Sequence, residues 1–524
     1  MDLNTILRFL VTISCLSLIV RVLMSRRNWG WLGVASSILG IMVASFVFFP
    51  EQSGIVGGIL WLTFVLIPIL GLRQVNHFVY QESFHKARRL ASVLSWLHPG
   101  DGWRDQPQFL YTLELIKKGE LARAQAILNR RGKGSSHGFN YVAQALQFRI
   151  EARWDDCLDW LESDLSEAEI WQSATLVSAY LRALGEVGEI NRLIWSVQSH
   201  RTQLYYLGDS IPINLARLYV FAFAGEVQAV QKLFQFPLNV YPEKVQQFWL
   251  ATAQIAAGNQ ECGQNLLYKI REKEIDLETA ISYRLSHSLP EASAVFTSES
   301  RQIINTIKKD LQQEINYGGA VSLTPKKANL TYSLMVINIL VFILEIIQGG
   351  SENLEVLYRL GAAVPEAIFS GEPWRVVTAN FLHFGYIHLG SNLLGLWILG
   401  PYVEFYLGWV RYLMIYTISG VGAIYLFADL AIITGREDDI LVGASAAIMG
   451  LMGATFTILW RGWRQENSKV AQERLRLVML IIGLQVVFDF TVANVSFLGH
   501  AFGLILGILT TSVILVFRKE KAIL

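Results

Sequence analysis

Cysteine and net charge are both scarce in this chain of 524 residues. Its three cysteines, at positions 15, 157 and 262, are far apart and support neither a disulfide framework nor a thiolate metal cluster. The formal net charge is only +1, so we expect no broad electrostatic attraction to nucleic acid. Hydrophobic residues, by contrast, make up 52% of the chain, which indicates a membrane protein rather than an ordinary soluble one.

Nine apolar runs approach the roughly 20 residues that a helix needs to cross the hydrocarbon core of a bilayer. Three come early in the chain, at 5–24, 31–49 and 54–72. Six come late, at 329–348, 383–400, 411–433, 441–460, 475–493 and 498–517. The first run has the position of a signal peptide, but Arg8 interrupts it and no convincing cleavage site follows, so we expect it to be retained.

Basic clusters in the short loops predict the orientation, because such clusters tend to remain cytoplasmic. They follow the first span ("RVLMSRRNWG"), the third ("KARR") and the seventh ("RGWRQENSKVAQERLR"), and they end the chain ("RKEK"). The loops "PEQSG", "GREDD" and "ANVS" lack them. The nine spans then alternate from an outside N-terminus to an inside C-terminus. Because no transit-like N-terminus is present, we expect a bacterial plasma membrane rather than an organelle.

The polar region between the third and fourth spans repeats a pattern of paired helices. Turns are expected near positions 119, 153, 188, 225 and 258, a period of 33 to 37 residues. This period is typical of stacked helical hairpins and resembles tetratricopeptide repeats. A full consensus is absent, so a helical bundle with accidental spacing remains the alternative. An array would offer a concave face to a cytoplasmic protein partner.

The sequence therefore predicts an all-α, polytopic membrane protein in four parts. Three transmembrane helices (1–74) precede soluble tetratricopeptide-like repeats (75–296). An amphipathic helix and linker (297–328) then lead into a six-span membrane domain (329–524).

Three of the nine histidines fall at or in the late membrane segments, namely His383, His388 and His500, and the other six are scattered through the front of the chain. Ionisable groups at that depth are costly and usually functional, although any single one is as readily a satisfied packing residue. His388 and Asn392 are four residues apart, so they project from the same face of a helix. Both can aim side-chain donors at one point.

Small residues predict which two late helices meet. His500, Gly503 and Gly507 share one helix face, and the glycines allow a neighbour to approach at backbone distance. We expect that neighbour to be the helix that Ser445 opens. It carries small residues at a matching four-residue spacing, namely Ala446, Gly450 and Ala454.

Contact between these helices would bring Ser445 Oγ within reach of the His500 ring. An imidazole can then take the serine proton as general base, as acyl transfer through a covalent intermediate requires. The Ser445 backbone N–H, His388 and Asn392 are candidate donors to the oxyanion. The alternative for Ser445 is a hydroxyl that bonds its own helix backbone or eases helix packing.

Together these motifs resemble the rhomboid family of intramembrane serine proteases over about 329–517, the last third of the chain. The family pattern appears in order as Trp374, Arg375, His383, His388, Asn392, Glu404, Gly443, Ser445, His500, Gly503 and Gly507. The resemblance implies a six-helix core, a dyad of Ser445 and His500, and an oxyanion site at His388 and Asn392. It implies cleavage of peptide bonds in or near a substrate's transmembrane segment, with no metal or organic cofactor.

The resemblance also assigns structural roles and shows two departures. Trp374 and Arg375 are expected to shape the first external loop, and Glu404 to hold a helix end. Ala446 stands where the family usually has glycine. Met449 stands where an aromatic residue often packs against the catalytic histidine, and its flexible side chain is an adaptable substitute.

Asp489 lies eleven residues before His500, which raises the possibility of a triad. Because Asp489 lies near the expected outer end of its helix, we expect instead an interfacial or hydrogen-bonded packing role, and the resemblance likewise implies a dyad. The predicted function is a serine protease acting on transmembrane substrates within the lipid membrane. One alternative is a catalytically inactive scaffold that binds transmembrane clients and cytoplasmic partners. A transporter or channel is disfavoured, because the polar residues form one protease-like cluster.

Overall fold

The computed structural model describes residues 3–25, 28–98, 100–130, 137–207, 210–271, 277–287, 289–318, 328–491 and 495–517. The predicted basic C-terminal cluster "RKEK" and most of the predicted linker lie outside these residues. The chain divides into two compact units, Met1–Lys309 and Asp310–Leu524. The division falls within the helix α20 (Ser298–Tyr317).

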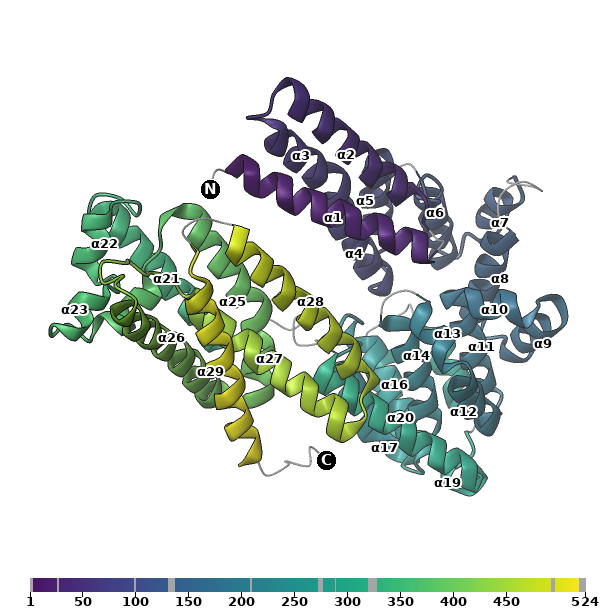
Figure 1. Cartoon of the computed structure of the whole chain (residues 1–524). Helices are drawn as coiled ribbons and strands as arrows, with labels where there is room; N and C mark the ends of the chain where they lie inside the picture. The colour runs from purple at the N-terminus through teal and green to yellow at the C-terminus, as the bar shows by residue number, and fades with distance from the viewer. Residues whose placement is uncertain are drawn as a thin grey trace. The chain divides into compact units, whose positions relative to one another are not determined.

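The first unit begins with three long helical segments that pack against one another (Figure 1). They are α1 (Leu3–Ser25), α2 (Gly30–Phe48) and a segment built from α3 (Ser53–Trp61), a π-helical turn at Leu62–Leu66, and α4 (Ile67–Tyr80). Buried apolar side chains join the three segments, including Cys15, Ile38 and Val65. Then α5 (Phe84–Leu97) follows, packed between α4 and the first hairpin helix α6 (Gln106–Lys117).

Five helical hairpins follow in the described residues of the first unit. Their members are α6 with α7 (Leu121–Arg130), α8 (His137–Glu151) with α9 (Trp154–Asp164), α11 (Ala174–Glu186) with α12 (Ile190–Ser199), α14 (Ile211–Phe223) with α15 (Val227–Gln235), and α16 (Glu243–Ala256) with α17 (Gln260–Arg271). Positive φ angles allow the chain to reverse at Gly119, Ala152, Gly188, Gly225 and Gly258. The predicted turn positions are therefore right to within one residue.

The first helices of successive hairpins lie side by side, α8 with α11, α11 with α14, and α14 with α16 (Figure 1). This stacking is the arrangement that a repeat array uses to bury a continuous core. The assignment of these hairpins to the tetratricopeptide class stays a prediction. Shorter helices complete the unit, at α10 (Glu167–Gln172), α13 (Arg201–Tyr206), α18 (Glu278–Ser286) and α19 (Ala292–Val295).

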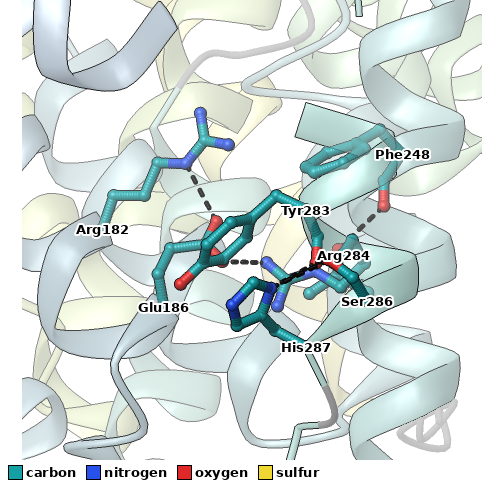
Figure 2. A network of polar contacts seen from close by, with 8 residues as sticks. Arg182, Glu186, Phe248, Tyr283, Arg284, Ser286 and His287 are labelled. Carbon is teal, nitrogen blue, oxygen red and sulfur yellow. Dashed lines mark hydrogen bonds and ion pairs between the residues drawn. The ribbon is translucent and has the colours of Figure 1, made fainter. Parts of the chain in front are cut away.

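A buried charge cluster ties α18 to the hairpins, and Figure 2 shows it from close by. Glu186 on α11 accepts hydrogen bonds from Arg182, at 3.2 Å, and from Arg284 on α18. The side chains of Glu186 and Arg284 are each only 1% exposed. The Arg182 guanidinium also lies over the rings of Trp154 and Trp249, at 4.5 and 4.9 Å. Thus one carboxylate compensates two buried cations contributed by segments about a hundred residues apart.

The second unit contains six long helices among its described residues. They are α21 (Asn329–Ile347), α25 (Gly385–Leu407), α26 (Trp409–Ile433), α27 (Ser445–Glu466), α28 (Lys469–Thr491) and α29 (Phe497–Val516). Short helices fill the loop between α21 and α25, at α22 (Leu354–Leu360), α23 (Pro365–Phe369), α24 (Arg375–Thr378) and a 3₁₀ turn (Ala379–Phe381). The central helix is α27, which contacts α25, α26, α28 and α29 (Figure 1).

Five helices in the described part of the chain are long and apolar enough to cross a membrane. They are Gly30–Phe48, Ser53–Tyr80, Asn329–Ile347, Trp409–Ile433 and Phe497–Val516. Each coincides with a predicted span. The other four predicted spans fold as helices of 22 or 23 residues, namely α1, α25, α27 and α28, and their crossing of the membrane stays a prediction.

The last residue of α20 is part of the core of the second unit. Tyr317 is fully buried, and its hydroxyl donates to Glu466 at the end of α27, at 2.5 Å. A side chain on Gly462 would collide with the Tyr317 ring, so the ring occupies the space that this glycine leaves. Burial raises the pKa of Tyr317 well above its usual range, which keeps the hydroxyl protonated as a donor. Arg474 on α28 donates to the Tyr317 carbonyl at 2.8 Å.

Candidate active site

Ser445 is the first residue of α27, as the sequence predicted. The extended segment before it is held to the loop that follows α21. Leu441 and Ala363 exchange two backbone hydrogen bonds of 3.1 and 2.9 Å, and the Gly443 N–H donates to the Ala379 carbonyl at 2.8 Å. Because the first N–H groups of a helix lack intrahelical acceptors, this end of α27 favours negative charge beside Ser445.

Gly443 brings this segment against α25. Its φ is +120°, a conformation that side-chain-bearing residues rarely adopt. A Cβ atom at this position would lie 2.6 Å from the Cε1 and Nε2 atoms of His388 and 3.3 Å from Asn392 Nδ2. The two residues predicted to aim donors at one point therefore both face the backbone two residues before Ser445.

A hydrogen bond to the His388 ring indicates which of its two nitrogens can donate. His388 Nδ1 accepts the Phe384 N–H at 3.3 Å, so a neutral ring carries its proton on Nε2, the atom beside Gly443. Asn392 is 6% exposed, and its Nδ2 atom has no acceptor among the described residues. Two N–H donors therefore lie beside the backbone that leads into α27, and among the described residues that of Asn392 has no acceptor.

Helices α27 and α29 meet at backbone distance. A Cβ atom on Gly503 would overlap the Ala446 carbonyl oxygen, and one on Gly507 would overlap the Gly450 carbonyl oxygen. The predicted pairing of these two helices through small residues is therefore confirmed. Gly503 lies one turn after His500 on α29, and Ala446 is the neighbour of Ser445. The contact places the His500 turn next to the start of α27.

His500 is partnered by a carboxylate from a third helix. Its Nδ1 atom lies 2.9 Å from both Oδ1 and Oδ2 of Asp489, on α28. The expectation of a hydrogen-bonded Asp489 is right, but its partner is the candidate general base rather than a packing residue. Ser445 Oγ and His500, both described here, share no hydrogen bond in this structure. Catalytic hydrogen bonds are often long before substrate binds.

Residues 370–517 match the Rhomboid domain family model. A putative rhomboid protease of Bacillus subtilis (strain 168), YdcA, is 34% identical over 166 residues, which are 31% of this chain and 75% of YdcA. The chain belongs to the rhomboid family. The rhomboid protease GluP of the same strain is 34% identical over 182 residues, which are 34% of each chain. Inactive RHOMBOID-like protein 8 of Arabidopsis thaliana is 36% identical over 100 residues, 19% of this chain and 27% of its own.

This rhomboid thus spans about a third of the length of GluP, and the matched domain begins only at residue 370. The rhomboid domain and the five apolar helices together indicate an integral, multi-pass membrane protein. No family is assigned to the helices that precede the domain.

Two polar residues of the rhomboid pattern have the structural roles that the sequence predicted. Arg375 is 3% exposed and donates from Nη1 to the carbonyls of Tyr358, at 2.6 Å, and Ala362, at 3.0 Å, so it holds the loop after α21 together. Glu404 accepts the N–H groups of Leu330 and Thr331, at 3.0 and 2.9 Å, and so caps the start of α21. Trp374 lies beside Arg375, with its ring 4.9 Å from the guanidinium.

His383, the remaining histidine of the rhomboid pattern, supports His388. The two rings meet edge to face with centroids 5.2 Å apart, and His383 is fully buried. Its backbone N–H donates to Glu345 at 2.9 Å. The sequence alone assigned no role in the site to His383 or Glu345. Among the residues that the structure describes, no three histidine, cysteine or acidic side chains are grouped to hold a metal ion.

The two departures from the rhomboid pattern are both buried. The contact at Gly503 is made by the carbonyl group and Cα atom of Ala446, so the Ala446 methyl group does not keep the helices apart. Met449 is 8% exposed, one turn into α27. The backbone contacts of α29 at Gly503 and Gly507 form with both departures in place.

Proposed function

We propose that this rhomboid is an intramembrane serine protease with Ser445 as nucleophile and His500 as general base and acid. The observation that carries the proposal is the convergence of three helices on one point. Gly443 brings the donors of α25 to the start of α27, and Gly503 brings the His500 turn to the same place. The family membership supports this reading, because both Bacillus relatives are named rhomboid proteases.

Acylation would begin with attack of Ser445 Oγ on the carbonyl carbon of the scissile peptide bond. A C–O bond forms, and the serine proton moves to His500 Nε2, the nitrogen that does not face Asp489. The carbonyl oxygen becomes an oxyanion that can accept hydrogen bonds from His388 Nε2–H, Asn392 Nδ2–H and the Ser445 backbone N–H. These donors are fixed before the reaction, so little reorganisation accompanies the charge.

Collapse of this intermediate breaks the C–N bond, and His500 passes its proton to the leaving amine. Water then attacks the acyl-enzyme, giving one proton to His500, and the ester C–O bond breaks. His500 returns that proton to Ser445 Oγ, so enzyme and proton count are restored. No cofactor is required by these steps.

The expected substrates are transmembrane segments of other proteins, cleaved in or near the bilayer. Family membership supports this class. The proposed topology follows the basic loops, with the catalytic serine near the outer surface of a bacterial plasma membrane and the hairpins in the cytoplasm. There the hairpins would bind a protein partner, and the four-part division predicted from the sequence forms part of the proposal.

A second candidate is an inactive rhomboid scaffold that binds transmembrane clients. Two observations favour it: Ser445 and His500 are not hydrogen-bonded to each other, and one relative is named inactive. This candidate predicts client binding without chemistry at Ser445.

Cleavage of fluorescently tagged transmembrane peptides in proteoliposomes tests the proposal. We expect the wild type to cleave and a serine-reactive phosphonate to label it, and we expect Ser445→Ala and His500→Ala to lose both properties while remaining folded. Absence of both cleavage and labelling in the wild type would favour the scaffold. Cleavage that survives Ser445→Ala would eliminate the proposed nucleophile.

A further inference from the structure

The structure carries an inference that goes beyond the two-residue mechanism and rests on the proposed protease function. We infer that Asp489 is a positioning residue, which holds His500 with its Nδ1–H toward α28 and its Nε2 lone pair available to Ser445. The site then has the logic of a Ser-His-Asp triad, with members from three helices: α27, α29 and α28.

The contact between Asp489 and His500 is close and shielded from solvent. Both carboxylate oxygens lie 2.9 Å from the same Nδ1 atom. The Asp489 side chain is 2% exposed and the His500 side chain 12% exposed. A hydrogen bond to an ionised carboxylate is stronger than one between neutral groups, and burial limits competition from water.

A second hydrogen bond holds the same carboxylate in place. Gln485, one turn earlier on α28, donates from Nε2 to Asp489 Oδ1 at 2.8 Å. Both carboxylate oxygens lie against the same ring nitrogen, and donation of an Nδ1–H from His500 to the carboxylate satisfies both groups. In the neutral ring the other nitrogen, Nε2, then carries the lone pair that a general base needs.

The position of Asp489 on α28 is unusual for a packing residue. The buried residues of this helix are Ala471, Leu475, Val478 and Asp489. The C-terminal half of the helix exposes apolar side chains, including Val487 and Phe490, and its one buried residue is Asp489. A buried carboxylate is costly unless it is paired, and its partner here is His500.

This arrangement would contribute in two ways. It selects the tautomer of His500 that can accept the Ser445 proton, and it stabilises the imidazolium that forms when the proton arrives. Asp489 itself does not touch the substrate and does not need to change protonation state. A two-residue site would have neither contribution from α28.

The test compares Asp489→Asn and Asp489→Glu with the wild type in the full-length protein, by peptide cleavage in proteoliposomes. The asparagine amide can donate to His500 Nδ1 and so favour the wrong tautomer, whereas glutamate keeps the acceptor. We expect kcat to fall roughly 10²-fold in the asparagine variant, with KM little changed. This is the low end of what general base catalysis contributes, and it corresponds to a His500 that seldom presents the Nε2 lone pair. We expect Asp489→Glu to recover part of that loss.

Glu404→Gln is the matched control, because Glu404 is also a buried carboxylate of this domain but caps α21 instead of contacting His500. Its loss should lower the melting temperature without lowering kcat in the folded fraction. Wild-type kcat in folded Asp489→Asn would overturn the inference. The inference would also be overturned if Asp489→Asn and Glu404→Gln lost the same stability and showed the same fall in kcat.

Nitrogen-15 NMR of His500 provides a readout that does not depend on activity. We expect the Nδ1–H tautomer in the wild type and in Ser445→Ala, and a shift toward Nε2–H in Asp489→Asn. An Nε2–H tautomer in the wild type would overturn the inference even in an active enzyme. If the wild type were inactive but showed the Nδ1–H tautomer, the proposed function would be contradicted and the positioning of His500 by Asp489 would still be supported.

Discussion

At the scale of single residues, the candidate site depends on glycine at position 443, which has no side chain. Gly443 has a φ of +120°, and a Cβ atom there would lie 2.6 Å from two atoms of the His388 ring. The ring can approach the 443–445 backbone only because this position has no side chain. The proposed oxyanion site therefore depends on this glycine, because it lets both donors approach the backbone before Ser445.

We expect Gly443→Ala to reduce kcat by about tenfold or more, since displacing one preorganised oxyanion donor typically costs 10²- to 10³-fold. The proteoliposome cleavage assay measures this. Gly390→Ala, on the same helix as His388, is the control, because a Cβ atom there would meet nothing within 4 Å. Equal activity of the two variants would argue that His388 does not serve the reaction.

Ala446 makes a second prediction at this scale. Because the atoms nearest a Cβ on Gly503 are backbone atoms of Ala446, Ala446→Gly should leave this close contact intact. We expect stability to fall by about 0.5 to 1 kcal/mol, from the greater freedom of glycine in the unfolded chain, with cleavage changed by less than about threefold. A large gain in activity would mean that the methyl group obstructs the site. Thermal unfolding in detergent and the cleavage assay measure the two effects.

The sequence predicted some residues of the site and missed others for physical reasons. The pairing of α27 with α29 was predictable because small residues at four-residue spacing mark a close helix contact. The bond between Asp489 and His500 was not, because it depends on the rotation of α28 about its axis, which no periodicity in that segment specifies. Nor does spacing reveal that the Phe384 N–H sets the tautomer of His388.

At the scale of helices, the close contact of α27 with α29 determines how well the two catalytic candidates are aligned. We expect Gly507→Val to destabilise the domain by about 1 to 3 kcal/mol or more, because its side chain would overlap the Gly450 backbone. Gly483→Val on α28 is the matched control, since no atom lies within 4 Å of a Cβ there. Thermal unfolding in detergent measures both. Equal melting temperatures would contradict the contact.

The hairpins make a separate prediction through Glu186. Removing its charge leaves the buried Arg284 uncompensated, so we expect Glu186→Gln to destabilise the attachment of α18 by about 3 to 5 kcal/mol. Hydrogen exchange of the α18 amides in the full-length protein measures the loss of protection. Glu189→Gln, which removes an exposed partner of Arg192, should cost about 0 to 1 kcal/mol and leave α18 unchanged. Unchanged exchange in both variants would refute the role of the cluster.

The hairpin turns were predictable because glycine, which readily adopts positive φ, stands at four of the five. The attachment of α18 was not predictable. It follows the last hairpin, outside the repeating pattern, and it reaches α11 through one arginine whose partner is distant in sequence.

At the scale of the whole molecule, the proposed orientation in the membrane makes a prediction about which cysteines are accessible from each side. Cys262 is exposed while Cys15 and Cys157 are buried, so it is a natural reporter for the hairpins. We expect a membrane-impermeant maleimide to label it in inverted vesicles but not in intact cells. A cysteine introduced by Asp438→Cys, in the exposed loop before Ser445, should behave in the opposite way. Labelling of Cys262 in intact cells would reverse the proposed topology, and Cys262→Ser gives the background.

The burial of Tyr317 determines how this protein can be dissected. The family match starts at residue 370, and the first membrane-spanning candidate of the second unit starts at Asn329. The compact unit itself begins earlier, at Asp310. A fragment trimmed to either of the later positions would lose the ring that fills the space beside Gly462 and the hydroxyl that bonds Glu466. Inactivity of such a fragment would report a damaged core at the foot of α27, not the chemistry of its serine. Expressed fragments of the rhomboid domain should therefore retain the end of α20.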